Sequence, residues 1–139
     1  MITIFMPWPL ECNYFGEYLH FYNILKNHKD VELVNDFEAD YIIYINDIKN
    51  IHNHIQKYKR KKLNYDLIEQ IKNYNNHEKE IILDYTDLTN TSFCCDPKIF
   101  NDVLLYFKRS IVYKKNMSLI NLNNIIPLSY GIRQDFLYY

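Results

Sequence analysis

Two pairs of charged residues stand where predicted strands end, and they are the side chains best suited to chemistry. Lys108 and Arg109 directly follow an apolar run, where cations can hold a phosphate or a carboxylate. Asp84 and Asp87 follow another apolar run, and paired carboxylates can act as acid and base or bind a metal. The alternatives are ion pairs between the two sets, or aspartates that only shape a turn.

Aromatic side chains offer a second kind of binding surface. The chain has 14 Tyr and 8 Phe but only 2 Gly. Tyr serves both cores and interfaces, and a Tyr-rich surface could bind sugars or bases. Abundant Ile, Asn, Lys and Tyr also indicate the codon bias of an AT-rich genome, which would add Tyr without any demand from function. Trp8 lies between two prolines after the first predicted strand, and we count it among the candidate acceptor- or phosphate-binding residues.

Histidine and cysteine do not predict a metal site. His52 and His54 are two residues apart, so on a helix they point to different faces, whereas zinc ligands on a helix prefer a spacing of four. Cys94 and Cys95 with His77 also lack the spacing of a zinc site. We therefore expect no bound metal.

One basic run, Tyr58–Lys62, could touch phosphates, but a solvated helix end explains it better, because the rest of the chain does not continue the basic patch. The formal net charge of −1 gives no field that would attract nucleic acid or an anionic membrane. Nucleic acid is therefore not the expected partner.

Glycine-rich phosphate-binding motifs are absent from the sequence. It contains neither G-x-G-x-x-G nor G-x-x-x-x-G-K-[ST], which excludes an ordinary dinucleotide-binding dehydrogenase and a P-loop NTPase. It also lacks G-x-S-x-G, the nucleophile elbow of α/β-hydrolases. No cofactor is predicted.

The cellular compartment is predicted from the cysteines and from the absence of long apolar runs in the sequence. Three cysteines, two of them adjacent, favour reduced thiols. The first residues lack the basic and apolar regions of a signal peptide, and no run approaches the roughly 20 apolar residues of a membrane span. We expect a cytoplasmic protein.

The elements that must position these side chains alternate between strand and helix over one domain of 139 residues. Strands are expected at Ile2–Met6, Val31–Val34, Tyr41–Ile45, Glu80–Leu83, Val103–Phe107 and Ile125-Ile126. Apolar stripes predict helices over Tyr14–His28, with Leu19 on its inner stripe, over Ile48–Tyr58 and over Leu67–Tyr74, with Asn64 or Asp66 near the start of the last.

This order is typical of βαβ units, so we expect an α/β fold with a mostly parallel sheet and helices on both faces. Ligands of such sheets bind at the carboxyl ends of the strands. The candidate segments there are Pro7–Asn13, Asn46-Asp47, Asp84–Asp87, Lys108–Ser110 and Ser129–Arg133.

Three segments in this order suggest a family. Ile82–Asp87 reads ILDYTD, Leu105–Ser110 reads LYFKRS, and Ile126–Ile132 reads IPLSYGI. This series resembles the amino-terminal half of GT-B-type, exostosin-like glycosyltransferases and of related bacterial and large-virus proteins. The resemblance implies a Rossmann-like three-layer αβα sandwich and an acceptor-side domain, since the carboxyl-terminal domain of GT-B enzymes holds most of the nucleotide-sugar.

The resemblance implies that Asp84, Asp87, Lys108 and Arg109 contact a sugar acceptor or a phosphate, and it names no catalytic base. The chain would be the acceptor-side half of such an enzyme or a reduced relative acting in glycan synthesis. The alternative is a non-catalytic interaction module that assembles with itself or with another subunit. Aromatic residues at 136, 138 and 139 would suit such docking.

Overall fold

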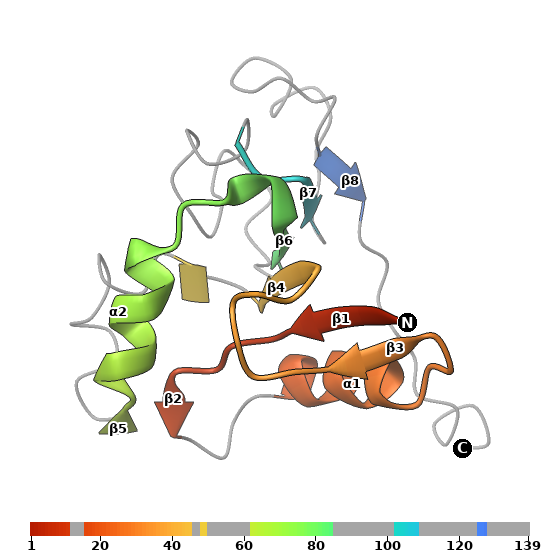
Figure 1. Ribbon diagram of the computed structural model, residues 1–139, viewed down its shortest axis with the longest axis horizontal. Coiled ribbons are helices and arrows are strands. Elements are labelled where there is room, and N and C mark those ends of the chain that lie inside the picture. Colours follow the sequence, from red (N-terminus) through yellow and green to blue (C-terminus); the bar gives the residue numbers. More distant parts are fainter. Residues whose placement is uncertain (12–15, 46–47, 50–61, 85–101, 109–124, 128–139) are drawn as a thin grey trace.

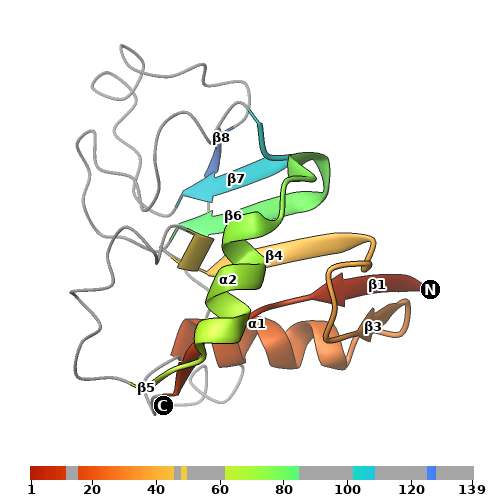
Figure 2. The same ribbon diagram turned by 60° about the vertical axis from the view of Figure 1, so that its left-hand side comes forward.

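Six parallel strands form the main sheet in the part of the chain that the structure describes. The computed structural model describes residues 1–11, 16–45, 48–49, 62–84, 102–108 and 125–127. The strands are β1 (Ile2–Phe5), β3 (Val31–Leu33), β4 (Tyr41–Ile45), β6 (Glu80–Asp84), β7 (Leu105–Lys108) and β8 (Ile125–Pro127). Their order in the sheet is β3-β1-β4-β6-β7-β8, and every neighbouring pair is parallel (Figures 1 and 2). The predicted strands are confirmed, each to within two residues at either end.

Strand β4 shows why the sequence forms a sheet covered on both sides. Its residues Tyr41–Ile45 are all β-formers, and the last four are buried although successive side chains point to opposite faces. A strand with one solvent-exposed face would alternate apolar and polar residues instead. This pattern confirms the expected central strand.

Helix α1 (Gly16–Lys26) covers one face of the sheet. Its side chains Tyr18, Phe21, Tyr22 and Leu25 pack against a core that we call the α1-side core, formed by Ile4, Met6, Ile43, Ile45 and Leu83. The expectation that Leu19 lies on this stripe is wrong, since its side chain is 43% exposed. Phe21, three residues after Tyr18 and four before Leu25, takes the inward position, which turns Leu19 toward solvent.

Helix α2 (Tyr65–Asn73) covers the opposite face. Asn64 caps it, accepting a hydrogen bond from the backbone N–H of Leu67 at 3.1 Å, which confirms the expected start. Its buried Ile68 and Ile71 join what we call the α2-side core, which also contains Phe5, Leu10, Ala39, Ile42, Tyr44, Ile48, Ile82, Val103 and Tyr106. The two cores on opposite faces make this a Rossmann-like αβα sandwich, as expected.

Two short elements join the end of β1 to the start of α2. Strand β2 (Leu10–Glu11) pairs antiparallel with β5 (Lys62–Leu63), and the N–H of Asn64 donates to the carbonyl of Pro9 at 2.8 Å. The end of the basic run, Lys62, therefore lies in a strand. The predicted helix over 48–58 falls mostly outside the described residues, as does the rest of that run. A 3-10 turn, η3 (His77–Lys79), leads into β6.

A side-chain lock fixes the register of β1 against β4. The Asp40 carboxylate accepts hydrogen bonds from the Thr3 N–H at 2.8 Å and the Thr3 hydroxyl at 3.0 Å, while that hydroxyl accepts from the Asp40 N–H at 2.9 Å. The next residues, Ile4 and Tyr41, are paired in the sheet. The lock therefore stands at the amino end of this strand pair.

The lock makes a pH-dependent contribution to stability. Hydrogen bonds from the Thr3 backbone and hydroxyl lower the pKa of Asp40 below its ordinary value of 3.8. A lowered folded pKa means that the contribution is complete above the unfolded pKa of 3.8 and is lost as pH falls through the folded value. We expect Asp40→Asn to destabilise the protein at pH 6 but much less near pH 2, measured by urea unfolding. A difference between variant and wild type that does not change with pH would contradict this assignment.

Candidate functional site

The strand order places a topological switch point between β1 and β4. The connection after β1 leads to β3 on one side, whereas β4, β6, β7 and β8 follow on the other. In open α/β sheets ligands bind outside the carboxyl ends of the strands at such a reversal. The carboxyl edge near β1 and β4 is therefore the candidate site, as the sequence predicted in general terms.

The segment after β1 supplies an aromatic wall at this edge. The Trp8 ring lies 4.8 Å from that of Tyr18, which stacks in turn on Tyr22 at 5.8 Å (centroid distances). Tyr18 donates a hydrogen bond to the carbonyl of Met6 at 2.8 Å, and burial, with a smaller effect of Tyr22, raises its pKa to about 12. Tyr18 therefore stays neutral near pH 7 and holds the segment after β1 onto α1.

Trp8 is half-buried and packs against both cores, so it closes the end of the sheet as well as facing the edge. Strand β4 separates β1 from β6, and at about 4.8 Å per strand the two carboxyl ends lie roughly 10 Å apart.

Asp84, the last residue of β6, is fully buried on the α2 side. Its carboxylate accepts a hydrogen bond from the hydroxyl of Tyr106 on β7, at 2.5 Å. A buried carboxylate needs such donors because water no longer solvates it. The pair therefore couples the ends of two neighbouring strands.

Lys108 is the other predicted residue that the sheet brings to this position. It ends β7 directly in register with Asp84 on β6, so the two backbones are neighbours at the carboxyl edge. Asp87 and Arg109 lie outside the described residues, as do segments 46–47 and 129–133. The sheet thus places the backbones of Asp84 and Lys108 side by side at its carboxyl edge.

Sequence reasoning missed a buried ionic cluster at the opposite end of β6. Glu80, the first residue of β6, is 0% exposed, and its carboxylate forms a hydrogen-bonded ion pair with Lys49 and a hydrogen bond with His77. Figure 2 shows α2 crossing the face of the sheet on this side. Asp84 lies four positions after Glu80 along β6, so at about 3.3 Å per residue the cluster lies roughly 13 Å from the carboxyl edge. The sequence did contain a signal for this cluster. A glutamate at the first position of an apolar strand is either buried with a partner or marks the point where the strand begins.

Aromatic rings surround this cluster. The Lys49 ammonium lies 5.0 Å from the centroid of the Tyr44 ring and 6.0 Å from that of Tyr74. Burial first, and then the nearby Glu80 carboxylate, raise the pKa of both tyrosines. The Tyr44 hydroxyl faces Glu80 without reaching hydrogen-bond geometry. The cluster therefore links η3, the segment after β4 and the start of β6 through a buried ion pair, and we assign it a structural role.

The described residues hold neither a metal-binding cluster nor a membrane-spanning helix. These residues contain no group of three or more His, Cys, Asp or Glu side chains placed to hold a metal ion. None of their helices is both long and apolar enough to cross a membrane.

Comparison of the chain with protein-family models, with curated proteins and with solved structures found no match. The site is therefore interpreted from its own geometry.

Proposed function

We propose that this chain is a glycosyltransferase-like α/β domain whose carboxyl sheet edge binds a sugar acceptor or a nucleotide-sugar. The observation that carries the proposal is the topological switch point between β1 and β4, flanked by the aromatic wall of Trp8 and Tyr18. Aromatic faces pack against sugar and base rings, and a nearby cation can pair with a phosphate.

In this proposal the residues divide into two roles. Trp8, Lys108 and, beyond the described residues, Asp87 and Arg109 contact the ligand. Asp84 and Tyr106, both fully buried, are positioning residues that hold the ends of β6 and β7 together. The resemblance to the acceptor-side half of GT-B enzymes supports this division, because there the second domain supplies most donor contacts. A cytoplasmic location and an AT-rich bacterial or viral genome belong to the same proposal.

Thermal unfolding with a panel of UDP- and GDP-sugars and their free nucleotides tests the function. A ligand at one hundred times its Kd should add about 2.7 kcal/mol to the free energy of unfolding. We expect Lys108→Ala to reduce the rise in Tm, whereas Lys72→Ala, an exposed lysine on α2, should leave it unchanged. A panel that leaves the Tm of the wild-type protein unaltered would refute nucleotide-sugar binding.

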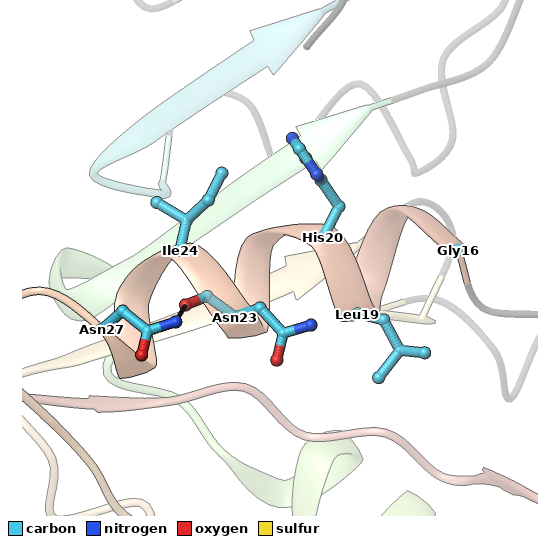
Figure 3. Close-up of a pocket in the computed structure, with 6 residues that line it drawn as sticks. All are labelled: Gly16, Leu19, His20, Asn23, Ile24 and Asn27. Carbon is cyan, nitrogen blue, oxygen red and sulfur yellow. Dashed lines mark hydrogen bonds between the residues drawn. The ribbon is translucent and has the colours of Figure 1, made fainter. Parts of the chain in front are cut away.

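A second candidate function is self-association through the outer face of α1. Leu19 and Ile24 are 43% and 50% exposed and border an open hollow on this helix, where His20 and Ile24 project to one side and Leu19 to the other (Figure 3). The hollow's described lining carries no charged side chain: it consists of Gly16, Leu19, His20, Asn23, Ile24 and Asn27. Two copies could therefore meet here without repulsion between like charges.

Light scattering as a function of concentration tests this second candidate. We expect the wild-type chain to form a dimer and the Leu19→Glu/Ile24→Glu variant to stay monomeric, because four carboxylates would face one another across the interface. Tyr65→Glu, at a 62% exposed position on α2, should keep the wild-type behaviour. A wild-type chain that is monomeric at millimolar concentration would rule out this interface.

A further inference from the structure

Two tyrosine hydroxyls on the α2 side of the sheet are buried and have no hydrogen-bond partner in the described part of the chain. One belongs to Tyr44 on β4, which is 0% exposed, and the other to Tyr74, the residue that follows α2 and caps it. Buried hydroxyls are nearly always hydrogen-bonded, because an unpaired one loses its contact with water and gains nothing in return. Each of these hydroxyls therefore requires a partner.

Both hydroxyls lie beside the buried ion pair of Lys49 and Glu80. The Lys49 ammonium lies 5.0 Å from the centroid of the Tyr44 ring and 6.0 Å from that of the Tyr74 ring. Burial first, and then the Glu80 carboxylate, raise the pKa of both tyrosines, and Tyr74 adds a smaller effect on the pKa of Tyr44. The two hydroxyls therefore share one neighbourhood, stay protonated near pH 7 and can donate hydrogen bonds.

The ion pair has hydrogen-bonding capacity beyond its described contacts. An ammonium carries three N–H donors, and the described bond of Lys49 to Glu80 uses one of them. A carboxylate offers about four lone pairs, and Glu80 bonds Lys49 and His77. A ligand that both donates and accepts would connect these groups to the hydroxyls. A further ion fits poorly, because the charges of Lys49 and Glu80 already balance and an added charge would be buried without compensation.

We infer that one buried water molecule joins the hydroxyls of Tyr44 and Tyr74 to the Glu80 carboxylate. The hydroxyls donate to the water oxygen, and the water donates to the carboxylate. Buried waters typically make about three hydrogen bonds to polar groups that lack another partner, and a polar contact that direct geometry does not close is often bridged in this way. The water links the end of α2 to β4 and β6, next to the packing of Tyr74 on Phe37 at 4.9 Å between ring centroids.

Thermal unfolding of Tyr44→Phe and Tyr74→Phe tests the bridge, because each change keeps the ring and deletes only the hydroxyl. We expect each variant to lower the Tm by a few degrees, and the double variant to lose less than the sum, since both hydroxyls bind the same water. Tyr65→Phe, at a 62% exposed position on α2, is the matched control and should keep the wild-type Tm.

The sign of the change separates the bridge from its alternatives. Deleting an unpaired buried hydroxyl relieves its desolvation cost, so an unchanged or higher Tm in either single variant would overturn the inference. Additive losses in the double variant would also overturn it, because they indicate that each hydroxyl has a partner of its own.

Oxygen-17 magnetic relaxation dispersion of the full-length chain detects the water itself, since it counts water molecules that stay bound while the protein tumbles. We expect the wild-type chain to hold about one more such water than the Tyr44→Phe/Tyr74→Phe variant, and Tyr65→Phe to match the wild type. Equal counts in the wild type and the double variant would overturn the inference in favour of direct contacts within the cluster. Neither measurement uses a sugar ligand, so both are independent of the glycosyltransferase proposal.

Discussion

Replacing Lys49 by methionine is expected to lower the free energy of unfolding by about 3 kcal/mol. Lys49 is 7% exposed and bonds Glu80, which is fully buried. Removing one member of a buried ion pair costs about 3–5 kcal/mol because the other charge stays buried without compensation. His77 also contacts Glu80 and limits the loss, so the lower end of this range applies.

Methionine keeps most of the apolar stem of lysine, so the change reports on the charge more than on packing over Tyr44. The double variant Lys49→Met/Glu80→Gln should recover part of the loss, since a neutral pair no longer buries a lone carboxylate. Lys72→Met on the exposed side of α2 is the matched control and should change stability by less than about 0.5 kcal/mol.

Urea unfolding followed by circular dichroism measures all three variants. Two outcomes would contradict the structural role given to the cluster. One is a Lys49→Met variant as stable as the control. The other is a Lys49→Met/Glu80→Gln variant that is less stable than Lys49→Met by as much as the independent loss of a second charged group would cost.

The fold could be predicted from the sequence because apolar periodicity reflects burial directly. Tyr41–Ile45 is a continuous run of β-formers, and only a strand covered on both faces tolerates such a run. The start of α2 was equally readable, since Asn64 precedes an apolar helical stripe and its side chain caps the helix. These local signals do not depend on distant partners.

The strand order and the small ribbon of β2 and β5 could not be predicted in the same way. Two-residue strands such as Leu10–Glu11 and Lys62–Leu63 have no periodicity to detect, and their pairing joins residues far apart in the chain. Leu19 and Phe21 show a related limit. Both are apolar, and only the orientation that the sheet imposes on α1 decides which of them faces inward.

The candidate site was predictable as a sheet edge but not as a network. The strand ends at Asp84 and Lys108 follow from the apolar runs before them, and the parallel register brings them together. The bond between Asp84 and Tyr106 and the cluster around Glu80 depend on which side chains share a face in three dimensions. The even-numbered residues Glu80, Ile82 and Asp84 point toward the α2 side. Which residues of β6 share a face can be assigned only when the first and last residues of the strand are known.

Removing the hydroxyl of Tyr106 is expected to be the next largest single change. Tyr106→Phe keeps the buried ring but deletes the donor to the Asp84 carboxylate. A hydrogen bond to a charged group contributes about 1.5–3 kcal/mol, so we expect a loss of that size in the free energy of unfolding. Tyr65→Phe, at an exposed position, should cost almost nothing.

The same variant separates the roles of Asp84, Tyr106 and Lys108 in the proposed function. Tyr106→Phe should lower stability and also weaken the nucleotide-sugar effect on Tm, because the ends of β6 and β7 lose a link. Lys108→Ala should weaken the ligand effect with less loss of stability, as a residue in direct contact would. Double-mutant cycles with Asp84→Asn then measure the coupling between hydroxyl and carboxylate. Additive effects of Tyr106→Phe and Asp84→Asn would mean that the pair does not hold the carboxyl edge together.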